Sequence, residues 1–403
     1  MTSLAKLLMH IPGIQNHITH WPVWQLAFRS CFLLATVASS LSLIYWLGML
    51  SGWWSLPGNG MSAIVWHLHE MIFGFAATVA IGFSLTAVQT WTGLPSLQGR
   101  SVMLLAGLWL LARIGFWLNN PDSLLMATIA QCLWWYCSIY AFTRLLFLSG
   151  NRRNYLLIPI FCAMALVNLI VILADFNGFT GMALHLGRTM VLMFTLLIAI
   201  IAGRVIPFFT ERGIGLIKIT KTQTLDRFLM SVSCAGIVVF TSGYFYPLPI
   251  SPAPLLIAAG TLHLVRLAFW FRRGILSRPL LWSLHLSYLF LAVGLIATGL
   301  SFLIIQLSLS AALHLITVGA IGLMILAMMS RVSLGHTGRP LTPTPWISVA
   351  FILLATAAVI RSALPALGYP LLAWQLSIAL WVSSMCLFLR FYSPILFSPK
   401  QSN

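Results

Sequence analysis

The feature of this sequence that most limits its fold is a succession of apolar runs, each about 20 residues long, separated by short breaks. Only 7% of the 403 residues are charged and 60% are hydrophobic, whereas soluble domains carry charge on about a quarter of their residues. A run of this length is what a helix needs to cross the hydrocarbon core of a lipid bilayer. The pattern therefore predicts an all-α, polytopic membrane helical bundle and excludes a soluble globular protein.

Twelve such runs can be marked, and no break between them is long enough to hold a separate soluble domain. The breaks contain Pro, Gly and Asn, which are typical of helix ends. We therefore expect a single transmembrane domain over residues 1–403. Its predicted spans are residues 28–49, 63–88, 102–118, 123–147, 155–174, 179–206, 228–245, 253–271, 280–300, 308–330, 346–363 and 371–390.

The positions of the cations predict the orientation of the spans. Eighteen of the 22 Lys and Arg residues lie near a terminus or in or beside alternate breaks, and the other four are Arg113, Arg188, Arg266 and Arg361. Because cytoplasmic segments are enriched in Lys and Arg, we expect both termini in the cytoplasm and every odd-numbered helix running outward. The net charge of +17 does not indicate a nucleic-acid partner, since the cations are spread over short breaks instead of gathering on one solvated face.

Ionisable residues inside the spans are the candidates for function, because each costs about 2.5–3.5 kcal/mol at mid-membrane unless a partner or a cavity receives it. Six histidines and a single carboxylate stand among them. A proton-driven antiporter more often carries Asp or Glu, so the imbalance points to imidazole chemistry. Neutral imidazole is a common ligand of heme iron, copper and zinc. The ten residues are His67, His69, Glu70, Arg113, His185, Arg188, His263, Arg266, His285 and His314.

Spacing along the helices suggests how these residues cooperate. Residues three apart share one face of a helix, and the pairs with this spacing are His67 and Glu70, His185 and Arg188, His263 and Arg266, and His285 and Tyr288. A carboxylate can orient a metal-bound imidazole, and an arginine inside the membrane needs an anion, such as a heme propionate. His67 and His69 face different directions and are expected to serve different sites.

The ionisable and cysteine side chains also allow roles without a metal. Each histidine could instead bind a neighbouring helix through a hydrogen bond alone. For Arg113, which has no histidine on its face, snorkelling or a helix–helix contact is preferred. His336 lies in a turn beyond the tenth span, where a loop or gating role is preferred. The six cysteines form no Cys-x-x-Cys pair, which argues against covalently attached heme.

Three blocks of this sequence resemble the NnrS family, and together they cover most of the chain from the second span to the turn after the tenth. They are Trp66-His67-Leu68-His69-Glu70 and the residues that follow, Gly203-Arg204-Val205-Ile206-Pro207, and the segment from His314 to Gly335-His336-Thr337-Gly338-Arg339-Pro340. The resemblance implies a twelve-span protein of the bacterial inner membrane that contains heme b and copper. It also implies a role in the response to nitric oxide during denitrification or nitrosative stress.

The resemblance also assigns residues to the metals. It implies that the metal-binding histidines are His67, His69, His185, His263, His285 and His314, with Glu70, Arg188, Arg266 and Tyr288 as partners of the ligands or of the propionates. Histidines on the second, sixth and tenth spans hint at three four-helix repeats, an architecture similar to that of the heme–copper oxidases. The adjacent-histidine copper motif of those enzymes is absent, and likeness of architecture is a weak guide to function.

Three functions follow as hypotheses. The first is a heme–copper protein that binds nitric oxide and could reduce it with electrons from an unidentified donor. The second is a secondary transporter of metal ions or anions, which fits twelve spans but not histidines that repeat every four helices. The third is a factor that protects iron cofactors without turnover.

Overall fold

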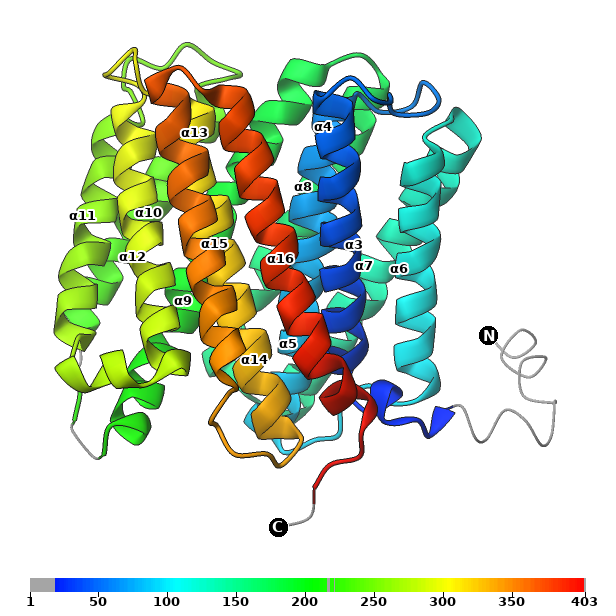
Figure 1. The fold of residues 1–403 in the computed structure, drawn as a ribbon, viewed down its shortest axis with the longest axis vertical. Coiled ribbons are helices and arrows are strands. Elements are labelled where there is room, and N and C mark those ends of the chain that lie inside the picture. The colour runs from blue at the N-terminus through cyan, green and yellow to red at the C-terminus, as the bar shows by residue number, and fades with distance from the viewer. Residues whose placement is uncertain (1–18, 216–217, 221, 402–403) are drawn as a thin grey trace.

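The structure is a computed structural model that describes residues 19–215, 218–220 and 222–401. Within those residues it contains helices and no strand, and twelve helices are long and apolar enough to cross a membrane. The predicted fold class is therefore confirmed. Figure 1 shows the helices standing side by side in one bundle.

The spans are made of α-helices, and two of them contain a π-helical segment. In chain order they are α3 (Ala27–Leu50), α4–η2–α5 (Ala63–His69, Glu70–Ala76 and Ala77–Thr92), α6 (Arg100–Leu118), α7 (Pro121–Ser149), α8 (Leu157–Phe176), α9 (Thr180–Gly213), α10 (Gln223–Ser242), α11 (Ala253–Trp270), α12 (Pro279–Leu300), α13–η5–α14 (Leu309–His314, Leu315–Gly322 and Leu323–His336), α15 (Pro345–Ala363) and α16 (Pro370–Phe397). Short 3-10 turns are η1 (Pro22–Trp24), η3 (Arg152–Asn154), η4 (Arg273–Ser277) and η6 (Leu364–Leu367).

Most predicted span ends agree with the structure to within a few residues, but three helices run on at the basic end of the bundle. Helix α9 continues past Pro207, the tenth span continues to His336, and α16 continues past Pro394. The predicted ends fall where the apolar runs stop. A helix keeps its internal hydrogen bonds beyond the hydrocarbon, and a proline removes only one of them.

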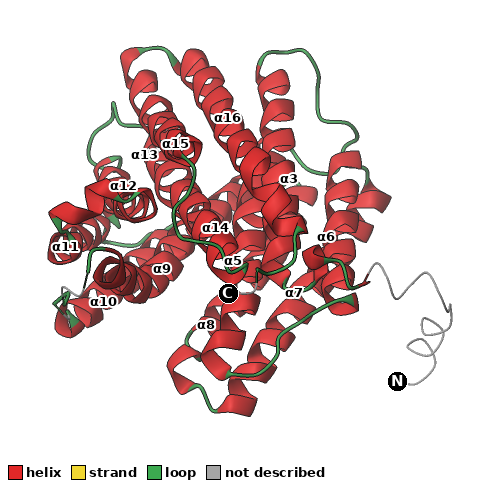
Figure 2. Ribbon diagram, turned by 60° about the horizontal axis from the view of Figure 1, so that its bottom comes forward, coloured by secondary structure: helices red, strands yellow, loops and turns green. Residues whose placement is uncertain are grey.

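The second, sixth and tenth spans lie at the centre of the bundle. Helix α9 contacts α4 and η5, and α5 contacts α14, so the three spans touch one another. Figure 2 shows α5 and α14 in the middle of the bundle with α9 beside them. A Cβ at Gly187 would clash with the Leu68 methyl groups, so this glycine allows the second and sixth spans to approach closely.

The π-helical segments η2 and η5 occur in the second and tenth spans. The first begins three residues after His67, and the second begins directly after His314. π-Helical turns are rare and are frequent at functional sites. They therefore draw attention to the region where these two histidines lie.

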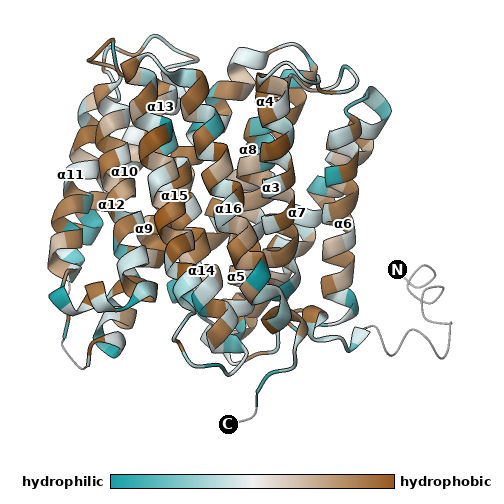
Figure 3. Ribbon diagram, viewed as in Figure 1, coloured by the Kyte–Doolittle hydropathy of each residue, from teal (hydrophilic) through white to brown (hydrophobic). Residues whose placement is uncertain are grey.

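The outer surface of the bundle and its ends differ in polarity. Figure 3 shows apolar residues along the sides of the helices and more hydrophilic residues toward the ends. At the basic end, Arg29 Nη1 donates hydrogen bonds to the carbonyls of Leu396 and Ser398, at 2.9 and 2.7 Å. The beginning of the first span and the end of the last span therefore lie on the same side. The cytoplasmic location of the termini stays a prediction, and residues 1–18 lie outside the described part.

Candidate functional site

A cavity of about 370 Å³ lies between the first, second, sixth, tenth, eleventh and twelfth spans. Its volume falls in the range of about 300–1,000 Å³ that is common for ligand pockets. Two histidines and two arginines line it, and no Asp or Glu does, so its lining is basic. Its charged, hydroxyl and indole residues are His67, His314, Arg188, Arg361, Ser310, Thr317, Ser377, Trp46, Trp374 and Trp381.

His67 lies in α4 with its ring against Trp46 of α3. The two rings are stacked with their centroids 4.5 Å apart and an interplanar angle of 9°. Neither imidazole nitrogen has a hydrogen-bond partner among the described residues, and Nδ1 is buried. A buried polar atom without a partner costs about 1–3 kcal/mol. His67 is therefore held in place by stacking while its nitrogens are left for a ligand.

His314 lines the same cavity from the end of α13. Its Nδ1 donates a hydrogen bond of 2.6 Å to the carbonyl of Ser310, one turn earlier. With the hydrogen on Nδ1, the lone pair of Nε2 is available, which is the arrangement of many metal-bound histidines. His67 and Arg361 both lie within electrostatic range of the His314 ring.

Polar contacts fix the beginning of the second span and so the position of His67. The carboxylate of Asp175, at the end of α8, accepts hydrogen bonds from Ser62 N at 2.6 Å and from Ser62 Oγ at 3.0 Å. A negative charge at a helix N-terminus is stabilising. Asn119 Oδ1 accepts a further bond of 2.7 Å from Met61 N. The start of α4 is thus tied to the ends of two other helices.

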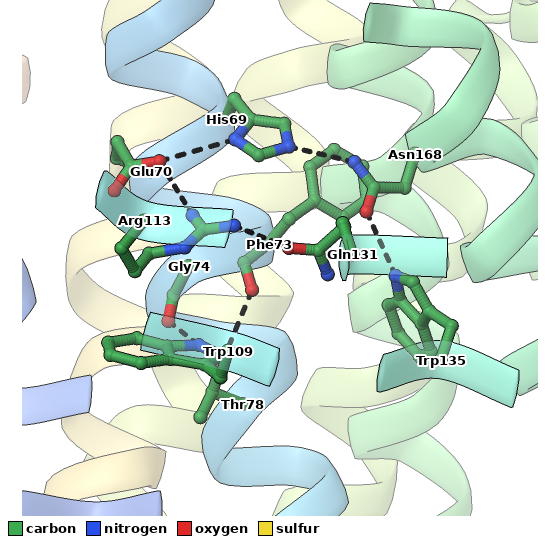
Figure 4. A network of polar contacts seen from close by, with 10 residues as sticks. All are labelled: His69, Glu70, Phe73, Gly74, Thr78, Trp109, Arg113, Gln131, Trp135 and Asn168. Atoms are coloured by element: carbon green, nitrogen blue, oxygen red, sulfur yellow. Dashed lines mark hydrogen bonds and ion pairs between the residues drawn. The ribbon is translucent and has the colours of Figure 1, made fainter. Parts of the chain in front are cut away.

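His69 is not among the residues that line the cavity. It belongs to a polar network, which Figure 4 shows. Its Nδ1 donates to Glu70 Oε1 at 3.4 Å, and its Nε2 accepts from Asn168 Nδ2 at 2.9 Å. Asn168 Oδ1 in turn accepts a 2.9 Å bond from Trp135 Nε1. Both ring nitrogens of His69 are therefore occupied by protein groups.

Glu70 and Arg113 form a buried ion pair in this network. Arg113 Nη1 donates to Glu70 Oε1 at 2.6 Å, and Nη2 donates to Gln131 Oε1. The glycine at position 74 makes room for the guanidinium, since a Cβ there would lie 2.6 Å from Nη1. Arg113 therefore makes the helix–helix contact that was expected, since it joins α6 to the second span and to α7 in the interior of the bundle. The three-residue spacing suggested that Glu70 contacts His67. Glu70 instead contacts His69 and Arg113.

A second polar network joins α9, α10, α11 and α12. Arg266 Nη1 donates to the carbonyl of Ala199 at 2.9 Å and to the Tyr288 hydroxyl at 3.1 Å, and Arg266 Nε lies 2.9 Å from Asp226 Oδ1. The Tyr288 hydroxyl shares a 2.6 Å hydrogen bond with His263 Nδ1. The charge of Arg266 is therefore balanced by Asp226. The three-residue spacing suggested that Tyr288 pairs with His285, but its partner is His263.

The remaining two histidines occupy separate places. His185 lies between the rings of Phe240 and Tyr244, with centroids 4.8 and 4.7 Å away, and its Nε2 lies 3.2 Å from the carbonyl of Thr241. It thus faces α10, although Arg188 one turn later lines the cavity. His285 Nδ1 donates to the carbonyl of Leu281 at 2.9 Å, and its buried Nε2 has no hydrogen bond.

Of the histidines expected to bind metals, the structure brings His67 and His314 to one cavity and places the other four elsewhere. No group of three or more His, Cys, Asp or Glu side chains in the described chain is arranged to hold a metal ion. Arg361 is a cavity residue that the sequence analysis left aside. The sequence did indicate that Arg361 is unusual, because it lies away from the basic breaks, and lone cations in such positions are uncommon.

The sequence was compared with known proteins. A family model described as NnrS protein matches residues 22–400, nearly the whole chain. The chain belongs to the NnrS family. A search of curated proteins finds no match. The resemblance to NnrS seen in the three sequence blocks is thereby confirmed, and membership of NnrS does not favour the transporter hypothesis.

Proposed function

We propose that this NnrS protein holds heme b in the cavity between His67 and His314 and binds nitric oxide there. The observation that carries the proposal is His67, an imidazole without a hydrogen-bond partner that faces the same cavity as the free Nε2 of His314. Two such imidazoles on adjacent central helices are suited to metal ligation. The π-helical segments beside both histidines support the choice of this region.

The cavity residues fit the needs of a b-type heme. His314 would hold the heme iron through Nε2, with Nδ1 donating to the Ser310 carbonyl and so orienting the ring. The indole rings of Trp46, Trp374 and Trp381 and the aliphatic lining would contact the flat, apolar macrocycle. Arg188 lines the same cavity, where it could pair with a propionate.

The residues fit copper less well. His67 is the one further imidazole in the cavity, whereas copper sites usually have two or more nitrogen or sulfur ligands from the protein. A copper ion bound at His67 would need ligands other than the described cavity residues. Metal analysis of the purified protein tests whether copper is bound. No role given to a residue below depends on copper.

The chemistry divides between the cofactor and the chain. Heme iron, when bound, supplies the site that binds nitric oxide. The Trp and aliphatic side chains limit access of water, and the His67 imidazole can donate a hydrogen bond to a bound diatomic molecule. The Glu70–Arg113 and Asp175 contacts hold the second span, and with it His67. Reduction of nitric oxide would further require an electron donor. We place the protein in the bacterial inner membrane with both termini in the cytoplasm.

The test is a heme assay on protein purified from heme-replete cells. We expect a Soret band that shifts when nitric oxide is added to the reduced protein, and we expect His314→Ala to lower the heme content per chain. His336→Ala is the matched control, because His336 lies at the far end of the tenth span against Phe28. Absence of a Soret band, or equal heme in the two variants, would contradict the proposal. Nitric oxide consumption by the reduced protein would distinguish a reductase from a binding or protective protein.

A further inference from the structure

Arg188 and Arg361 line the cavity without a carboxylate partner. Arg188 makes no hydrogen bond or ion pair with any described residue. Arg361 reaches Ser310 Oγ at 3.4 Å, a long contact, and lies over the Trp374 ring at 5.8 Å from its centroid. Cations without a carboxylate partner are costly inside a membrane protein.

The arginines of the two polar networks behave differently. Arg113 contacts Glu70, and Arg266 contacts Asp226. The three other carboxylates of the chain do not serve the cavity: Asp175 binds the start of the second span, and neither Asp122 nor Glu211 lines the cavity. The chain therefore supplies no internal anion to balance Arg188 and Arg361.

We propose that Arg188 and Arg361 form an anion-binding site that receives a carboxylate or a small oxyanion. A guanidinium group presents a planar fork of donors that matches two oxygens of such a ligand. The His67 imidazole, whose nitrogens have no hydrogen-bond partner among the described residues, can add an N–H donor from the same cavity. The surrounding Trp and aliphatic groups make the cavity less polar than water, which strengthens the attraction.

The position of the site suggests two sources for its ligand. Arg361 lies in the last turn of α15, and Ile64, another lining residue, is 48% exposed at the start of α4. A free oxyanion could therefore enter from the adjacent end of the bundle. The propionates of a bound heme would present the same chemistry. The inference rests on the cavity used in the proposed function, but the site exists with or without heme.

The first experiment uses purified, heme-free full-length protein and formate as the probe. We expect formate to raise the unfolding temperature, because a ligand of the folded state stabilises it, whereas neutral formamide does not. Replacing both arginines by glutamine should raise the apparent Kd for formate at least about tenfold, or about 1.4 kcal/mol. Arg339→Gln is the control, since Arg339 follows the tenth span at the other end of the bundle. Arg361→Lys, which keeps the charge, should weaken binding less than Arg361→Gln.

The second experiment tests the propionate source by loading the same proteins with heme b or with its dimethyl ester. If propionates occupy the site, the ester should load at least about tenfold more weakly than heme in the wild type and equally in the double glutamine variant. Formate binding that depends on the arginines supports a free oxyanion, even if no heme loads and the proposed function fails. Ester discrimination that depends on the arginines supports the propionates. If neither ligand responds to the arginines, or if formamide stabilises as much as formate does, the anion site is disproved.

Discussion

The Glu70–Arg113 pair allows a quantitative test of the network that supports the cavity. The side chain of Glu70 is 0% exposed and that of Arg113 is 6% exposed, and Arg113 Nη1 lies 2.6 Å from Glu70 Oε1. Replacing Glu70 by Gln keeps the shape but leaves the Arg113 charge unbalanced. Removing one partner of a buried ion pair costs about 3–5 kcal/mol. We expect a loss of that size in the free energy of unfolding for Glu70→Gln and for Arg113→Met separately.

The double variant tests whether the two losses have one cause. Because it removes both charges, its loss should be smaller than the sum of the single losses by about 2–3 kcal/mol, within the range measured for contacting residues. Reversible unfolding in mixed micelles, followed by fluorescence of the 16 Trp residues, measures these free energies. Asp122→Asn is the control, since Asp122 lies exposed in the first turn of α7 and should cost less than about 1 kcal/mol. Equal losses for Glu70→Gln and Asp122→Asn, or additive losses in the double variant, would refute the reasoning.

Two further predictions concern the polar networks. A Cβ at Gly203 would clash with the Arg266 guanidinium, so Gly203→Ala should disrupt the hydrogen bonds from Arg266 to Ala199 and Tyr288. We expect this variant to lower the free energy of unfolding by about 1–3 kcal/mol. Gly107→Ala is the control: its Cβ would meet no atom within 4 Å, so it should be neutral or stabilise the helix by up to about 1 kcal/mol. Asn168→Leu should leave His69 Nε2 and Trp135 Nε1 unpaired and cost about 1–3 kcal/mol for each. The same unfolding assay checks both, and a harmless Gly203→Ala or Asn168→Leu would show that the corresponding network contributes little.

The helices could be predicted from the sequence because their signals are local. An apolar run of about 20 residues specifies a span regardless of what it packs against. Breaks that contain Pro, Gly or Asn then separated neighbouring spans, as Asn119 and Asn120 do between α6 and α7. The π-helical segments η2 and η5 could not be predicted, since no residue type marks them. The extra turns of α9 beyond Pro207 depend on backbone hydrogen bonds that a hydropathy pattern does not reveal.

The site was predictable only in part, because contacts between helices decide which face of a span is used. Three-residue spacing suggested that Glu70 serves His67, but the charge of Arg113 on the next helix draws its carboxylate to the other side. Charge balance could have identified this pair, since Glu70 is the one carboxylate inside the predicted spans. The joining of His67 and His314 in one cavity depends on packing between residues 247 positions apart, which the spacing along a single helix does not reveal.

The most direct test of the account is the heme content per chain, measured by pyridine hemochrome, in alanine variants of three histidines. The central claim is that His314 holds heme in the cavity that it shares with His67, whereas His185 packs between aromatic rings. The account predicts that His314→Ala lowers the heme content and that His67→Ala and His185→Ala retain it. Full heme content in His314→Ala, or loss of heme in His185→Ala, would contradict it.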